Sequence, residues 1–229
     1  MESDFERNLS LERKHLASIL KTVRRLKTVS DEELIKAQSE LASVFKYDRD
    51  NTDLLEVRQL LFERAEDLSR AMKYALNQPY FTRVDFIPKD ADKEIIYIGK
   101  HSVIPEKSYE PLVHDWRAPI ANLYYSGQVG PMRYETPDGS VEGELTLKRN
   151  FSIIDGRLES MFDSDIVSKD AYLQSVLSAA SGDRLRDIVT SIQAEQNYVI
   201  RYPLKESLIV QGVAGSGKTT IAQIGRAHV

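Results

Sequence analysis

Residues 212–219 form the segment with the clearest chemical potential, and they have the sequence Gly-Val-Ala-Gly-Ser-Gly-Lys-Thr. This segment matches the pattern of a glycine, four residues and then Gly-Lys-Thr that is typical of phosphate-binding loops. Glycines let the backbone curl, so that successive N–H groups point inward and can bind phosphate oxygens. The sequence therefore predicts a nucleotide-binding loop.

The side chains of this loop have expected roles. Lys218 would place its ammonium on the β- and γ-phosphates of ATP, and Thr219 would offer its hydroxyl to Mg²⁺. ATP and Mg²⁺ are therefore the expected cofactors, with Lys218 and Thr219 as the candidate catalytic residues. The expected contacts to the nucleotide come from Gly212, Val213, Ala214, Gly215, Ser216, Gly217, Lys218, Thr219 and Thr220.

The elements around the loop should position it. The apolar run 208–210 predicts a short strand before it, and residues 220–222 can begin a helix after it. Upstream, Ser168 and Gly182 are expected to cap and stop one helix. A second helix is expected from Asp187 to Tyr202, ended by Pro203. A phosphate loop alone does not name a reaction, because kinases, transporters and GTPases share it.

The first third of the chain predicts an antiparallel helical hairpin. Apolar residues recur at helical spacing along residues 9–45 and again along residues 54–76, and the turn formers of 47–53 separate the two stretches. Ser30 followed by Glu33 has the form of a capping box, which predicts a further helix start at Asp31.

Between the hairpin and the phosphate loop the apolar period becomes that of strands. Residues 80–160 predict a mostly antiparallel sheet or small barrel, with a long strand that closes at Asp155-Gly156. The expected fold class is thus mixed α/β, with a P-loop (RecA-like) domain beginning near the end. The expected strands are 81–86, 95–98, 101–104, 111–115, 121–126, 131–135 and 144–154.

Composition limits the class of protein. The chain has 229 residues, 41% of them hydrophobic and 29% charged, which supports a buried core. It has no cysteine, so disulfides and thiolate metal sites are excluded, and its four histidines lack zinc-ligand spacing. The net charge of −4 neither supports nor excludes a nucleic-acid partner. No stretch is apolar for the length of a membrane span, and we expect a cytoplasmic protein.

A series of segments in order resembles the HelD/helicase IV-like branch of the UvrD/Rep-type superfamily 1 helicases. In that superfamily a glutamine upstream of the phosphate loop contacts the adenine base, and Gln196 is similar to it in position. An amide suits this role because it donates and accepts hydrogen bonds together. The segments are YIGKHSVI (97–104), HDWRAPIANLYYS (114–126), LKRNFSIIDGRL (147–158), DIVTSIQAEQNYVIR (187–201) and VQGVAGSGKTTIA (210–222).

The resemblance implies an ATP-dependent motor with DNA as a partner through further motor domains. It also implies RNA polymerase as a partner, contacted by the hairpin of residues 1–78. A β-rich segment with the DWRAP signature (79–165) and the start of the motor domain (166–222) would follow. Two alternatives stay open: a motor that unwinds DNA directly, and a non-enzymatic polymerase-binding module with a vestigial phosphate loop. The substitution Lys218→Ala distinguishes these alternatives, because a non-enzymatic module would keep its activity after this change and a motor would not.

Two smaller features have competing interpretations. Asp48, Asp50 and Asp53 cluster in the turn of the hairpin, where they could reach toward a polymerase's catalytic Mg²⁺ or simply cap the following helix. Asp115 and Arg117 of the DWRAP segment predict a local ion pair at Trp116. A structural role for that pair is favoured over catalysis, because no nucleophile with its base is present.

The last residues depart from the resemblance. Residues 224–229, Ile-Gly-Arg-Ala-His-Val, are what the adapter-like DNA string ATCGGAAGAGCACACGTC encodes, and we interpret residues 223–229 as a sequencing artefact. The acidic Mg²⁺-binding motif, the γ-phosphate arginine and the second motor domain of the family do not occur in the chain. We therefore expect it to bind nucleotide weakly and not to hydrolyse ATP or translocate.

Overall fold

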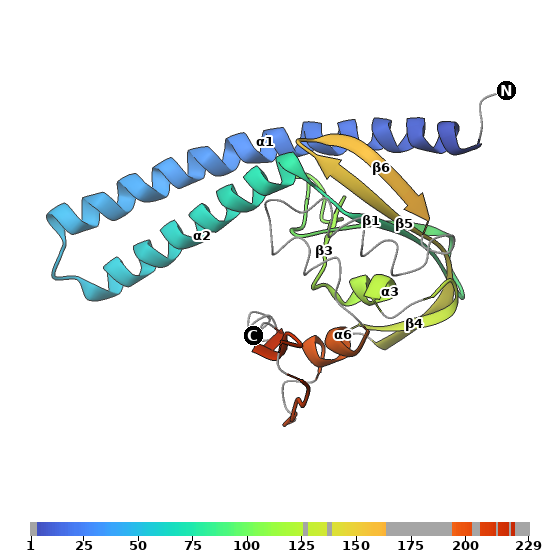
Figure 1. Cartoon of the computed structure of the whole chain (residues 1–229). Coiled ribbons are helices and arrows are strands. Elements are labelled where there is room, and N and C mark those ends of the chain that lie inside the picture. The colour runs from blue at the N-terminus through green and yellow to red at the C-terminus, as the bar shows by residue number, and fades with distance from the viewer. Residues whose placement is uncertain are drawn as a thin grey trace. The chain divides into compact units, whose positions relative to one another are not determined.

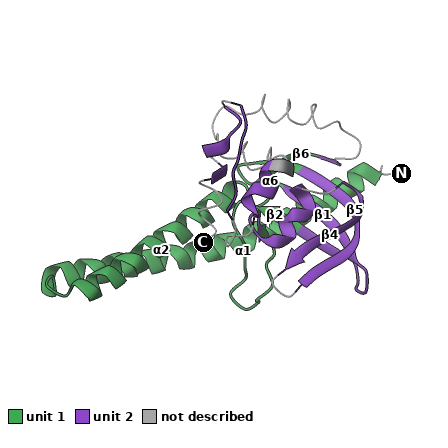
Figure 2. Cartoon of the chain, turned by 90° about the horizontal axis from the view of Figure 1, so that it is seen from below, with its two compact units in different colours: residues 1–81, 97–114, 151–161 green, residues 82–96, 115–150, 162–229 purple. Residues whose placement is uncertain are grey.

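The computed structural model describes residues 4–125, 128–136, 139–163, 194–202, 207–213, 215–219 and 221–222. The described part mixes long helices with a sheet, which confirms the mixed α/β class, whereas the start of a P-loop domain stays a prediction. The chain divides into two compact units that alternate along the sequence (Figure 2). Unit 1 is Met1–Phe81, Tyr97–His114 and Phe151–Met161, and unit 2 is Thr82–Ile96, Asp115–Asn150 and Phe162–Val229. The predicted domain boundaries stay predictions.

Two long antiparallel helices, α1 (Asp4–Tyr47) and α2 (Thr52–Asn77), form the hairpin expected from the sequence (Figure 1). The side chain of Asn51 caps α2 by accepting a hydrogen bond from the N–H of Leu54 (3.2 Å). An ion pair between Arg58 and Glu40 joins the two helices. Among the described residues, no helix has both the length and the hydropathy needed to cross a bilayer.

The predicted helix start at Asp31 is wrong, because α1 runs through it without interruption. The Ser30 side chain is buried, and its hydroxyl donates to the carbonyl oxygen of Lys27 (2.9 Å) instead of capping a helix start. Asp31 accepts hydrogen bonds from Lys27 and from the Ser69 hydroxyl of α2, and these bonds hold the pKa of its carboxyl below the ordinary value. Contacts within α1 and to α2 therefore override the capping pattern.

The strands form a sheet of order β3-β2-β1-β5-β4, with β6 paired to β5. β1 runs antiparallel to β5, and the register shifts between Asp85 and Phe86. β4 runs antiparallel to β5 from Gly130, opposite Leu145, to Thr136, opposite Gly139. The expected strands at 81–86, 95–98, 131–135 and 144–154 are present. The bounds are Thr82–Pro88 (β1), Glu94–Gly99 (β2), His114–Asp115 (β3), Gly130–Thr136 (β4), Gly139–Ile154 (β5) and Arg157–Asp163 (β6).

Three strand expectations are corrected. Residues 121–125 do not form a strand but continue the 3-10 helix η1 (Pro119–Ala121) into helix α3 (Asn122–Tyr125). Proline suits the first turn of a helix, and Pro119 begins η1. Residues 101–104 and 111–115 supply only the bridge between Val103 and Val113 and the two-residue strand β3.

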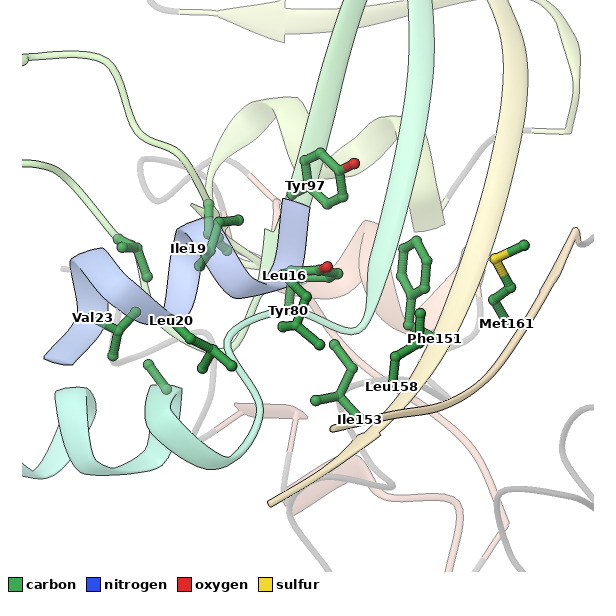
Figure 3. Close-up of a cluster of buried hydrophobic side chains, with 13 residues drawn as sticks. Leu16, Ile19, Leu20, Val23, Tyr80, Tyr97, Phe151, Ile153, Leu158 and Met161 are labelled. Atoms are coloured by element: carbon green, nitrogen blue, oxygen red, sulfur yellow. The ribbon is translucent and has the colours of Figure 1, made fainter. Parts of the chain in front are cut away.

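A buried cluster in unit 1 joins strands to the root of the hairpin, by which we mean residues 16–23 of α1 and Ala75 of α2 (Figure 3). Leu16, Ile19, Leu20 and Val23 of α1 pack there with side chains from β2, β5 and β6. The strand residues and loop residues of the cluster are Tyr80, Tyr97, Val103, Val113, Phe151, Ile153, Leu158 and Met161. Burial of this apolar surface is the main source of stability expected for unit 1.

The turn between β5 and β6 contacts the end of α2. Asp155 and Gly156 have φ values of 49° and 70°, and two consecutive residues at positive φ are typical of a tight hairpin turn. The N–H of Gly156 donates to the carbonyl oxygen of Asn77 (2.8 Å), and the N–H of Asp155 donates to the Asn77 side chain. The predicted end of the long strand at Asp155-Gly156 is confirmed.

Candidate nucleotide-binding site

The described part of the phosphate-loop segment has the backbone expected of glycines in a tight loop. Gly215 and Gly217 both have a φ of 81°, which favours glycine because a side chain would be strained there. Helical residues follow, and the N–H of Ile221 donates to the carbonyl oxygen of Gly217 (3.0 Å). Ala214 and Thr220 lie outside the described residues. Two of the three glycines of residues 212–219, Gly215 and Gly217, therefore occupy positions that favour glycine.

Lys218 folds back on this loop. Its Nζ donates to the carbonyl oxygens of Gly212 (2.8 Å) and Val213 (2.7 Å), and the Ser216 hydroxyl lies 3.4 Å away. The ammonium is thus held by polar atoms of residues 212–216 themselves. The exposed Thr219 follows at the start of the helical residues.

The strand predicted at residues 208–210 is wrong. Residues 207–213 have no regular secondary structure, and Ile209 is 86% exposed. An apolar strand of a parallel sheet is covered on both faces and paired at its sides. No strand in the described part of the chain pairs with residues 208–210, so nothing there buries them.

Gln196 lies beside the loop. It belongs to helix α6 (Ala194–Ile200), which lies within the helix predicted for 187–202 and ends two residues before the predicted end. A methyl group built on Gly217 would be 3.8 Å from Nε2 of Gln196, so the amide and the loop are near neighbours. Residues 187–193, and the helix predicted between Ser168 and Gly182, lie outside the described residues.

The DWRAP turn is bound by Arg201, a contact that the sequence pattern did not indicate. The guanidinium donates from Nη2 to the carbonyl oxygen of Trp116 (3.1 Å), and from Nη1 to those of Arg117 (3.0 Å) and Ala118 (3.1 Å). Its Nε donates to Oδ1 of Asn197 (2.8 Å). Burial lowers the pKa of Arg201 from its ordinary value, but a guanidinium remains charged at neutral pH.

The predicted pair within the DWRAP turn is present. Arg117 Nη1 lies 3.8 Å from Asp115 Oδ2, and the N–H of Arg117 donates to Asp115 Oδ1 (2.8 Å). The Arg117 guanidinium also lies 5.7 Å from the centre of the Trp116 ring. Beside them, burial lowers the pKa of His114, which keeps its imidazole neutral at pH 7. These contacts support a structural role for the turn.

The three carboxylates of the hairpin turn are exposed. The cap of α2 is Asn51 rather than an aspartate, and Asp53 lies in the first turn of that helix, where a negative charge is favourable. Among the described residues, no three carboxylates or histidines are grouped so that they could hold a metal ion. The idea that Asp48, Asp50 and Asp53 reach toward a polymerase-bound Mg²⁺ stays a prediction.

Comparison with known families gives one match. A family described as "DNA helicase IV HelD, N-terminal domain" matches residues 9–176, which is more than half of the chain. No curated protein matches. The matched range covers the hairpin and the sheet and ends before Gln196 and the phosphate-loop segment, so the match and the loop pattern are independent observations.

Proposed function

Because this chain belongs to the family of DNA helicase IV HelD N-terminal domains, we propose that it is the N-terminal part of an ATP-dependent helicase-like motor. Residues 212–220 bind the phosphates of ATP with Mg²⁺, and Gln196 contacts the adenine. One observation carries the proposal. The chain has a complete phosphate-loop pattern, and the amide of the upstream Gln196 lies beside Gly217 of that loop.

Each residue has a defined task in this proposal. The Lys218 ammonium exchanges its contacts with the carbonyl oxygens of Gly212 and Val213 for oxygens of the β- and γ-phosphates. Thr219 offers its exposed hydroxyl to Mg²⁺. The positive φ of Gly215 and Gly217 directs backbone N–H groups toward an anion, as in other glycine-rich nests.

Lys218→Ala is expected to weaken binding of Mg-ATP by about 10–100-fold, because a charge-assisted hydrogen bond contributes about 1.5–3 kcal/mol. Isothermal titration of the 229-residue chain measures this change. Lys107→Ala, at an exposed lysine of unit 1, is the matched control and should bind like the wild type. Equal affinity of the Lys218→Ala and wild-type chains would refute phosphate binding by this loop.

The hairpin is proposed to bind RNA polymerase, and DNA is proposed as the substrate of the motor. Large apolar side chains remain exposed on both of its helices, which is a feature of interaction surfaces. They include Ile35, Phe45 and Tyr47 of α1 and Val57, Leu60 and Leu61 of α2. This observation also favours the alternative of a polymerase-binding module without ATPase activity, in which Lys218→Ala changes no activity.

The double substitution Ile35→Ala and Leu60→Ala is expected to weaken capture of RNA polymerase several-fold, because each removes exposed apolar surface of the hairpin. Surface plasmon resonance with immobilised polymerase measures the affinity. Ile95→Ala, at an exposed isoleucine of β2 in unit 2, serves as the control. If wild-type chain and double variant bind polymerase equally, the hairpin is not the contact surface.

A further inference from the structure

We propose that Arg201 is a positioning residue that sets the selectivity of the nucleotide site for adenine. It does so by fixing α6 on the DWRAP turn, so that Gln196 on the same helix stays beside Gly217. The proposal deepens the proposed ATP site and rests on it. It also gives the DWRAP segment a task in that site.

The first step is the geometry of the turn. The N–H of Ala118 donates to the carbonyl oxygen of Asp115 (2.9 Å), and the N–H of Arg117 donates to the Asp115 side chain. The carbonyl oxygens of residues 116–118 consequently converge on one cation, the Arg201 guanidinium. These carbonyl oxygens are partly buried, and leaving such groups without a donor is unfavourable.

The second step is a parallel connection through two asparagines. Nδ2 of the buried Asn197 donates to Oδ1 of Asn122 at the start of α3 (2.6 Å), while its Oδ1 accepts from Arg201. Arg201 directly follows the last residue of α6, and its N–H donates to the carbonyl oxygen of Asn197 (3.1 Å), so the helical turn continues through it and the side chains of Asn197 and Arg201 lie on one face. This face is therefore bound at two points to the segment 116–122.

The third step concerns the neighbouring residue. Gln196 precedes Asn197 in the helix, so fixing the Asn197–Arg201 face also fixes the direction of the Gln196 side chain. A helix as short as Ala194–Ile200 has little stability of its own, and tertiary contacts must hold it. Without Arg201 the helix can rotate or shift, and the amide then loses its position beside Gly217.

The planar guanidinium is suited to this task. It presents five donors in a fixed plane, and four hydrogen bonds to the oxygens of Trp116, Arg117, Ala118 and Asn197 are formed here. Glutamine at this position offers only two N–H donors and no charge. Arg201→Gln should therefore release α6 from the turn without introducing a clash.

The experiment measures the affinities of the wild-type chain for Mg-ATP, Mg-GTP and magnesium tripolyphosphate, which carries phosphates but no base. Arg201→Gln should lower the preference for ATP over the other two ligands about fivefold, the factor for one lost hydrogen bond, with tripolyphosphate affinity unchanged. Gln196→Ala should have the same effect, and the double variant should lose no more. Arg133→Gln, at an exposed arginine of β4, is the control.

The outcomes separate the two proposals. If the wild-type chain binds none of the ligands, the proposed ATP site fails. If the wild type prefers ATP and Arg201→Gln keeps that preference, or loses all three ligands equally while folded, the positioning role is overturned. Should circular dichroism show Arg201→Gln to be unfolded, Arg201→Lys decides, because lysine keeps the charge but cannot form the four hydrogen bonds of the planar guanidinium; an unchanged ATP preference then overturns the proposal.

Discussion

Ile153→Ala is expected to lower the free energy of unfolding by about 2–5 kcal/mol, the range measured for truncating a buried isoleucine to alanine. Ile153 is 0% exposed on β5 and belongs to the cluster at the root of the hairpin. Its truncation leaves a cavity in that cluster, which the other buried side chains can fill only in part. Urea denaturation followed by tryptophan fluorescence and far-UV circular dichroism measures the change.

The neighbouring residue provides a matched control. Ile154 has the same side chain on the same strand but is 41% exposed, because successive side chains of a strand point to opposite faces. Ile154→Ala should change the free energy of unfolding by less than about 1 kcal/mol. Equal effects of the two substitutions would contradict the orientation of β5, since a shift of one residue exchanges the buried and exposed faces.

Strands in which apolar and polar residues alternate clearly, or which end in a clear turn sequence, could be predicted from the sequence. The Asp155-Gly156 pair marks the end of β5 because both residues favour the positive φ that a tight turn needs. The pairing partner after that turn, β6, was missed. Its burial does not alternate: Leu158 and Met161 are buried while the two residues between them are exposed. The period of two that identifies a half-buried strand is absent there.

In the candidate site, too, features set by neighbouring residues could be predicted from the sequence, whereas contacts between distant residues could not. The loop pattern is local, so the residues 212–219 could be chosen from the sequence alone. The partners of Arg201 could not, because they are backbone carbonyl oxygens of residues that lie 83–85 positions earlier in the chain. Every residue has a backbone carbonyl oxygen, so the residue types do not indicate which of these oxygens will accept a hydrogen bond. Only the turn geometry that Asp115 stabilises brings three of them together.

Glu32→Pro is expected to lower the free energy of unfolding by about 3 kcal/mol or more, because α1 is continuous at this position. Proline at position 32 removes the N–H that bonds to the carbonyl oxygen one turn earlier, and its ring clashes with that carbonyl. Glu32 is exposed, so the substitution removes no buried side chain and its effect reports on the backbone alone. Thermal unfolding followed by far-UV circular dichroism measures the loss.

Glu32→Ala controls for the lost carboxylate and should be neutral or slightly stabilising, since alanine has the higher helix propensity. The two interpretations of this region predict different results for proline. A helix that began at Asp31 would hold residue 32 in its first turn, where the missing N–H has no partner and proline is tolerated. A Glu32→Pro chain as stable as Glu32→Ala would therefore restore the helix boundary that Ser30 and Glu33 indicate. A large loss of stability instead means that α1 is one unbroken helix, within which Asp31 bonds to Lys27 and to Ser69 of α2.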